Sequence, residues 1–177
     1  MILPLFRRAS RNGDTISALY GAIVAQARSP AFYRDYAVAD TVGGRFELIL
    51  VHLALVLRRL AGDETLRPLG QDIFDLFCAD MDRNLREMGI SDLKVPKEME
   101  RIGTAFYGRK AAYDTALEAT ADTAALLEAL HRNVYASPNA PPQAAARLAA
   151  YMRQTEQLLE QQDTGALARG ELRFPDP

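Results

Sequence analysis

Few residue pairs in this chain have the spacing that catalysis or metal binding requires, and the most suggestive is Glu128 with His131. A Glu-x-x-His pair is what each of two helices contributes to the di-iron centre of a carboxylate bundle protein. Such a centre needs a second pair, but Ile49 occupies the position where a glutamate would accompany His52. No third histidine exists, so the sequence argues against a di-metal site.

Other kinds of chemistry find equally little support. A tetrahedral zinc site would need Cys78, His52 and His131, which lie far apart in the sequence. The chain has neither a Gly-rich phosphate loop nor a Gly-x-Ser-x-Gly elbow. We interpret Cys78 as a small buried apolar residue and His52 as a hydrogen-bonded core residue. The sequence therefore predicts no catalytic residue, no metal and no cofactor, and the protein is not expected to be an enzyme.

A line of polar residues follows one side of the segment from Gln71 to Tyr113. Asp80, Asn84 and Glu87 recur at steps of three or four, which places them on one face of a helix. Beside them runs an apolar stripe at the same spacing, formed by Phe74, Phe77, Met81, Leu85 and Met88. This arrangement suits a surface that holds another polypeptide better than it suits a reaction centre.

Charged residues accompany this line. Asp82 with Arg86, and Arg83 with Glu87, are spaced four apart, and each pair stabilises an exposed helix by only about 0.2–0.5 kcal/mol. These pairs fit a solvated face as well as a recognition surface. A basic set follows downstream, made of Lys94, Lys97, Arg101, Arg109 and Lys110.

The elements that position these residues are predicted to be helices. The apolar stripe indicates a helix from about Pro68 to Met88, which ends at Gly89, a residue suited to a left-handed C-terminal position. Pro96 fits the first turn of a second long helix, which runs through Leu117 and continues or restarts to about Tyr135.

The remaining segments also show helical patterns, and none shows the sustained alternation of a strand. A central helix that begins at Asp40 or Thr41 is apolar nearly all round between Phe46 and Leu57, a run too short to span a membrane. Further helices are expected from Asp14 or Thr15, after Ser29-Pro30, and from Pro142 to about Gln162, with a break at residues 137–142. The predicted fold is an all-α compact bundle of about six or seven helices with long central helices.

Composition agrees with a single soluble domain. The chain has 177 residues, is 49% hydrophobic and carries a net charge of −2. Its basic and acidic residues are interspersed, which argues against DNA binding, and no secretory signal is evident. We expect an irregular N-terminal arm over residues 1–13, a helical domain over 14–163 and a C-terminal tail over 164–177.

Residues 79–90, together with Ser91–Lys97, resemble the core motif of the ubiquinol–cytochrome c chaperone family. Supporting likeness lies in residues 20–36, in Arg45-Phe46-Glu47 with His52, and in residues 106–110 with Tyr113, so that the resemblance covers about Ile16 to Leu130. It implies an assembly factor, since mitochondrial members bind newly made cytochrome b while ubiquinol–cytochrome c reductase (respiratory complex III) is built. Those members work with a small partner protein and associate with the ribosome near the tunnel exit.

The chain lacks a transit-peptide-like extension and a strongly basic arm, which suggests a bacterial protein with weak support for ribosome contact. The resemblance implies a location in the bacterial cytoplasm at the periphery of the inner membrane, with immature cytochrome b as the client. The expected client-binding residues are Tyr33, Tyr36, Asp80, Asn84, Glu87, Asp92, Lys94, Lys97, Tyr107 and Arg109. The polar members come from the motif and the aromatic members from the reasoning that a client groove is apolar.

Two other functions stay open at this point. One is a binding protein or enzyme for a small ligand such as a quinone or lipid, with an apolar pocket between the central helix and the helix 68–88. A closed cavity that holds His52 and Asp80 would favour this function. The other is a structural subunit of a membrane complex, and it would remain in the mature complex where a chaperone would leave.

Overall fold

A computed structural model describes residues 3–118, 123–135 and 141–177 of the chain. Within these residues all regular elements are helices, which confirms the all-α prediction. They are α1 (Leu3–Ala27), α2 (Pro30–Arg34), α3 (Val42–Ala61), α4 (Arg67–Glu87), α5 (Val95–Glu118), α6 (Ala124–Asn133), α7 (Pro142–Gln161) and α8 (Thr164–Ala168). The break expected at residues 137–142 lies largely outside the described residues.

Helix α3 is the centre of the fold, as its apolar run predicts. Residues 48–57 are all buried, because α1, α4, α5 and α7 pack around this helix. Its start is fixed by Thr41, whose hydroxyl accepts a hydrogen bond of 3.1 Å from the Gly44 amide. A Cβ atom on Gly44 would lie 2.0 Å from the backbone oxygen of Ala39, so the glycine permits a close approach by the chain's own backbone.

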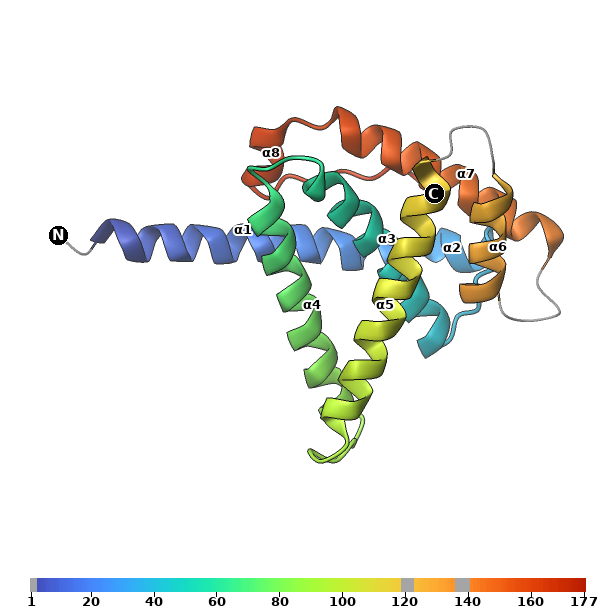
Figure 1. The fold of residues 1–177 in the computed structure, drawn as a ribbon, viewed down its shortest axis with the longest axis horizontal. Coiled ribbons are helices and arrows are strands. Elements are labelled where there is room, and N and C mark those ends of the chain that lie inside the picture. Colours follow the sequence, from blue (N-terminus) through green and yellow to red (C-terminus); the bar gives the residue numbers. More distant parts are fainter. Residues whose placement is uncertain (1–2, 119–122, 136–140) are drawn as a thin grey trace.

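Helices α4 and α5 form an antiparallel hairpin that projects from the body of the molecule, with its loop at the bottom of the view in Figure 1. Gly89 ends α4 with a φ of +82°, as predicted. The Ile90 amide then donates a hydrogen bond of 3.0 Å to the Leu85 carbonyl, which closes the helix end. Pro96 lies in the first turn of α5. The motif of residues 79–97 therefore makes up the distal half of α4, the loop and the start of α5.

The expected irregular arm over residues 1–13 is wrong, because α1 already begins at Leu3. The turn signal Asn12-Gly13 lies inside this helix. A glycine in a helix costs only about 1 kcal/mol relative to alanine, so a long helix can pass through it. A local turn signal is therefore a weak predictor when helix follows on both sides.

The C-terminal segment packs onto the body, although its glycines and prolines indicated a loose tail. Asp163 caps the short α8 by accepting a hydrogen bond of 2.8 Å from the Ala166 amide. Leu167 is buried, and the Phe174 ring lies 5.4 Å from the ring of His52. The Pro175 carbonyl accepts a hydrogen bond of 2.9 Å from the Gln26 side chain on α1. These long-range contacts are invisible to a reading of local composition.

Candidate functional site

The burial of side chains is described for residues 13–118, 123–135, 141 and 143–177, and among these most of the exposed large apolar side chains belong to the α4–α5 hairpin. They are Val42, Met88, Leu93 and Tyr107, and the last three lie on the hairpin or its loop. Leu93, in the loop of the hairpin, is 95% exposed. We call Met88, Leu93 and Tyr107 the hairpin apolar surface.

The polar line on α4 is divided between a contact inside the fold and open solvent. Asp80 is half-buried and accepts a hydrogen bond of 2.8 Å from the Tyr20 hydroxyl on α1. Burial raises the pKa of Tyr20, and the hydrogen bond to the negatively charged Asp80 raises it further. Asn84 is exposed and donates to the backbone oxygen of Asp80 at 2.8 Å, while Glu87 is exposed near the helix end. Asp80, Asn84 and Glu87 thus follow one another along α4 as their spacing predicts, but Asp80 is covered by Tyr20 of α1.

The hairpin loop is held together by one arginine. The Arg86 guanidinium pairs with Asp82 at 2.7 Å and also with Asp92 in the loop. Two carboxylates thus share one guanidinium, and hydrogen bonding to Arg86 lowers the pKa of Asp82. Lys94 and Lys97 are exposed next to this cluster. The loop thus presents Lys94 beside the exposed Leu93, and Lys97 lies in the first turn of α5.

Arg109 has a structural contact that the sequence did not reveal. It donates two hydrogen bonds of 2.6 Å each to the Glu47 carboxylate on α3. The two side chains are only 22% and 13% exposed, and these hydrogen bonds raise the pKa of the guanidinium. Arg109 therefore joins α5 to the central helix, whereas its neighbour Tyr107 is 59% exposed.

Two of the three aromatic residues expected in the client site are Tyr33 on α2 and Tyr36 just after that helix, and α2 lies well away from the hairpin loop in Figure 1. The Tyr33 hydroxyl donates a hydrogen bond of 3.0 Å to the Ala27 carbonyl. The Tyr36 ring packs 5.3 Å from Phe32 and 6.1 Å from Tyr151. Both side chains are half-buried against the core. The structure therefore does not bring them together with Asn84, Glu87 and the loop.

A buried polar network surrounds His52. The histidine is fully buried, with Nδ1 2.7 Å from the Leu48 carbonyl and Nε2 2.9 Å from the Tyr151 hydroxyl. That hydroxyl also accepts a hydrogen bond of 2.9 Å from Gln26. Burial lowers the pKa of His52 to about 4, so the ring is neutral at pH 7. These contacts agree with a hydrogen-bonded core histidine.

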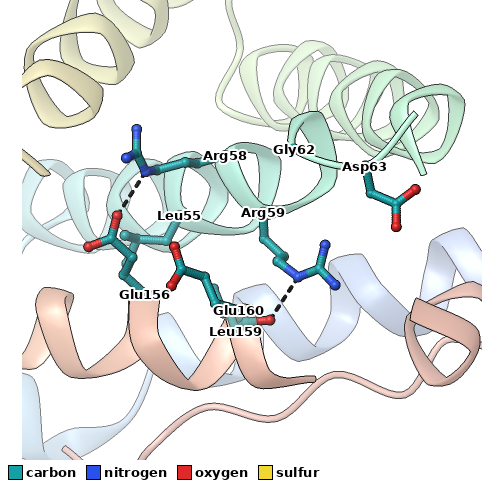
Figure 2. Close-up of a pocket in the computed structure, with 8 residues that line it drawn as sticks. All are labelled: Leu55, Arg58, Arg59, Gly62, Asp63, Glu156, Leu159 and Glu160. Atoms are coloured by element: carbon teal, nitrogen blue, oxygen red, sulfur yellow. Dashed lines mark hydrogen bonds and ion pairs between the residues drawn. The ribbon is translucent and has the colours of Figure 1, made fainter. Parts of the chain in front are cut away.

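One cavity, of about 540 Å³, lies between α3, α7 and the start of the α3–α4 loop (Figure 2). Both arginines in its walls are already engaged by the protein. Arg58 pairs with Glu156 at 2.9 Å, and Arg59 donates to the Leu159 carbonyl at the same distance. Arg59 also donates to the Gln162 carbonyl, so it caps the end of α7. Both arginines therefore hold α3 and α7 together at this cavity.

A second, smaller cavity of about 190 Å³ opens between α3, α4 and α5 at the base of the hairpin. We call it the notch, and its walls are Leu57, Ala61, Arg67, Gly70, Gln71, Phe74, Phe106, Tyr107 and Lys110. It lies where the ligand-binding alternative expected a pocket, between the central helix and α4. Neither His52 nor Asp80 lines it, and its volume is below the roughly 300–1,000 Å³ of typical small-molecule sites. The notch is sized for a single side chain.

Comparison with known proteins places these features in a family. Residues 34–174 match the family model described as ubiquinol-cytochrome C chaperone, a range that includes the whole hairpin. A solved structure described as the Cbp3 homolog from Brucella abortus is 41% identical, with a TM-score of 0.87 over 99% of this chain and 97% of that chain. No curated protein sequence matches the chain. Among the described residues, no helix has the length and apolar character needed to cross a membrane.

Proposed function

The chain belongs to the ubiquinol-cytochrome C chaperone family, and from this premise we propose that it binds newly made cytochrome b while ubiquinol–cytochrome c reductase is assembled. The family assigns a chaperone role in building that complex. Cytochrome b as the client, and the hairpin as the surface that binds it, are the parts that we add. In this proposal the protein releases its client and is absent from the mature complex.

The observation that carries the proposal is the hairpin apolar surface. Where burial is described, most of the large apolar side chains are buried, yet Met88, Leu93 and Tyr107 are between 59% and 95% exposed on one projecting element. Met88 and Leu93 lie at the loop end of the hairpin, and Tyr107 lies nearer its base. We propose that the client contacts the hairpin along this length, because apolar side chains gathered at a surface mark sites of contact with other molecules. Methionine suits a reversible contact, because its flexible side chain adapts to different surfaces.

The polar residues around this surface fit the same role. Asn84 and Glu87 on α4, Lys94 in the loop and Lys97 on α5 are exposed on the same hairpin as the apolar groups. An apolar centre with a polar rim is the usual composition of a non-obligate protein interface. We therefore retain Asn84, Glu87, Asp92, Lys94, Lys97 and Tyr107 as proposed client contacts, and we assign Asp80, Arg109, Tyr33 and Tyr36 mainly to the stability of the fold.

The nature of the client explains why such a surface is needed. A newly made cytochrome b exposes apolar helices before it packs and before haem is in place. We propose that the chaperone meets it at the cytoplasmic face of the bacterial inner membrane, as a peripheral protein. A small partner protein and the ribosome are further proposed contacts, and the family resemblance is their sole support.

The test is capture of the client from the cells that make the protein. Tagged wild type, the double variant Met88→Ser with Leu93→Ser, and the control Val42→Ser are purified after gentle solubilisation and compared by mass spectrometry and haem absorbance. Val42 is 76% exposed but lies outside the hairpin, so it controls for the loss of an exposed apolar group.

We expect wild type and Val42→Ser to enrich immature cytochrome b without the other subunits of the complex, and the double variant to lose most of it. Recovery of the complete complex would show a structural subunit instead. If wild type fails to enrich cytochrome b in cells that produce it, the proposal is wrong.

A further inference from the structure

We propose that the notch at the base of the α4–α5 hairpin receives a bulky apolar side chain of the client, next to an acidic residue of the same client segment. This inference rests on the proposed function and specifies which kind of client segment is recognised. It concerns the notch walls, of which only Tyr107 also belongs to the hairpin apolar surface.

The shape of the notch points to one anchoring side chain. Its deep walls are Leu57, Gly70 and Phe106, all buried, and its outer walls include Tyr107 and Gln71, both exposed. Interface anchors are typically aromatic or large apolar side chains that fill such pockets. A volume of about 190 Å³ leaves little room for a quinone or an acyl chain.

Aromatic rings extend the notch along the hairpin. The Phe74 ring lies 4.9 Å from that of Phe106 and 5.5 Å from that of Tyr107. These distances are typical of stacked or tilted aromatic contacts, and a further aromatic ring entering the notch would continue the series. Since Tyr107 is 59% exposed, its ring can contact an incoming side chain without a rearrangement of the core.

The charged side chains around the notch indicate which kind of client residue lies next to the anchoring side chain. Its walls include Arg67 and Lys110 but no carboxylate, in contrast to the larger cavity with Asp63, Glu156 and Glu160. Lys110 is paired with Asp114 at 2.5 Å. Arg67 is 59% exposed, and its carboxylate neighbour Glu64 lies 3.7 Å away and is 88% exposed. A client carboxylate beside the anchor can therefore replace Glu64 at Arg67, whereas a basic neighbour would meet no carboxylate in the walls.

The chain contains no tryptophan, so Tyr107→Trp provides a single fluorescent reporter in the wall of the notch. The reporter protein is titrated with overlapping fluorescein-labelled peptides that cover the cytochrome b of the same cells. Anisotropy of the label reports binding anywhere on the protein, and tryptophan emission reports occupancy of the notch.

Three substitutions in this reporter background complete the design. Gln71→Phe fills the mouth of the notch, and Arg67→Glu reverses its exposed charge. Arg132→Glu is the matched control, because Arg132 is also 59% exposed and lies 3.6 Å from a glutamate, but on α6. Urea unfolding of each variant confirms that it is folded.

We expect peptides with a large apolar residue next to Asp or Glu to bind and to shift the tryptophan emission to shorter wavelength. Arg67→Glu should weaken their binding about 5-fold, the size expected when one exposed ion pair is replaced by a repulsion. Arg132→Glu should leave the binding within about 2-fold of the reporter protein, and Gln71→Phe should abolish the emission shift.

Several outcomes would overturn the inference, and they separate it from the proposed function. If peptides bind by anisotropy while emission and the Arg67→Glu variant show no effect, the client binds elsewhere and only the notch is wrong. If no peptide binds although full-length cytochrome b is still captured, the notch is again wrong and the chaperone role stands. An emission shift with phosphatidylglycerol vesicles that Arg67→Glu removes, in the absence of any peptide response, would identify a lipid site instead.

Discussion

The guanidinium of Arg109 on α5 donates two hydrogen bonds of 2.6 Å to the carboxylate of Glu47 on α3, a helix more than fifty residues earlier in the chain. Both residues belong to segments that resemble the family motif. The structure shows that this pair fixes the base of the hairpin to the core. A residue within a family motif therefore need not contact the client, and stability measurements distinguish the two roles.

Replacement of Arg109 by Met should lower the free energy of unfolding by about 2 kcal/mol, because it leaves the half-buried Glu47 carboxylate unpaired. The double variant Arg109→Met with Glu47→Gln should recover much of this loss, since the uncompensated charge is then gone. Urea unfolding followed by circular dichroism measures both. A variant with unchanged stability but lost capture of cytochrome b would instead make Arg109 a client contact.

The hydrogen bond between Tyr20 and Asp80 should appear as a coupling in a double-mutant cycle. Tyr20→Phe and Asp80→Ala should each destabilise the protein by about 1 kcal/mol, and the combined variant should lose clearly less than the sum because both remove the same bond. Chemical denaturation of the four proteins gives the coupling energy. If the stability losses of the two single variants simply add up in the double variant, the hydrogen bond contributes nothing to stability. Asp80 would then again be a proposed client contact.

Gly44 should tolerate no side chain, whereas its neighbour Gly43 should. A Cβ atom at Gly44 would lie 2.0 Å from a backbone oxygen, while one at Gly43 has no contact closer than 3.8 Å. We expect Gly44→Ala to destabilise the protein by about 1–3 kcal/mol, the range of overpacking substitutions, and Gly43→Ala to be neutral or slightly stabilising. Thermal unfolding of the two variants tests this difference, and equal melting temperatures would contradict it.

Stability should fall in mild acid because of His52. Its pKa is lowered from 6.5 to about 4 by burial, so the unfolded chain binds a proton that the folded protein does not. The contribution of the neutral ring is complete above pH 6.5 and is lost progressively as pH falls toward 4, to a total of about 3 kcal/mol.

Urea unfolding at pH 7.0, 5.5 and 4.5 measures this contribution when wild type is compared with His52→Gln, which cannot titrate. The variant should be less stable at pH 7 but should lose less stability between pH 7 and 4.5. His131→Gln, at an exposed position, should behave as wild type. Parallel curves for wild type and His52→Gln would exclude His52 as the cause.

The helices themselves were predictable from local pattern. The apolar stripe gave α4 as 68–88, and the structure places it at Arg67–Glu87, with Gly89 in the left-handed conformation. The apolar run of the central helix correctly predicted its burial on all sides. These features depend on residues a few positions apart, so periodicity and capping signals contain the necessary information.

The sequence by itself therefore determined the fold class, most helix boundaries and the family, while the tertiary structure decided what each polar residue does. No local pattern shows that Arg109 meets Glu47, that Tyr20 covers Asp80, or that Phe174 returns to His52. Exposure of Leu93 and Tyr107, and the notch beside Tyr107, likewise depend on how α3, α4 and α5 meet. The physical reason is that secondary structure follows from short-range geometry, whereas burial, ion pairing and cavities arise only when segments distant in the chain pack together.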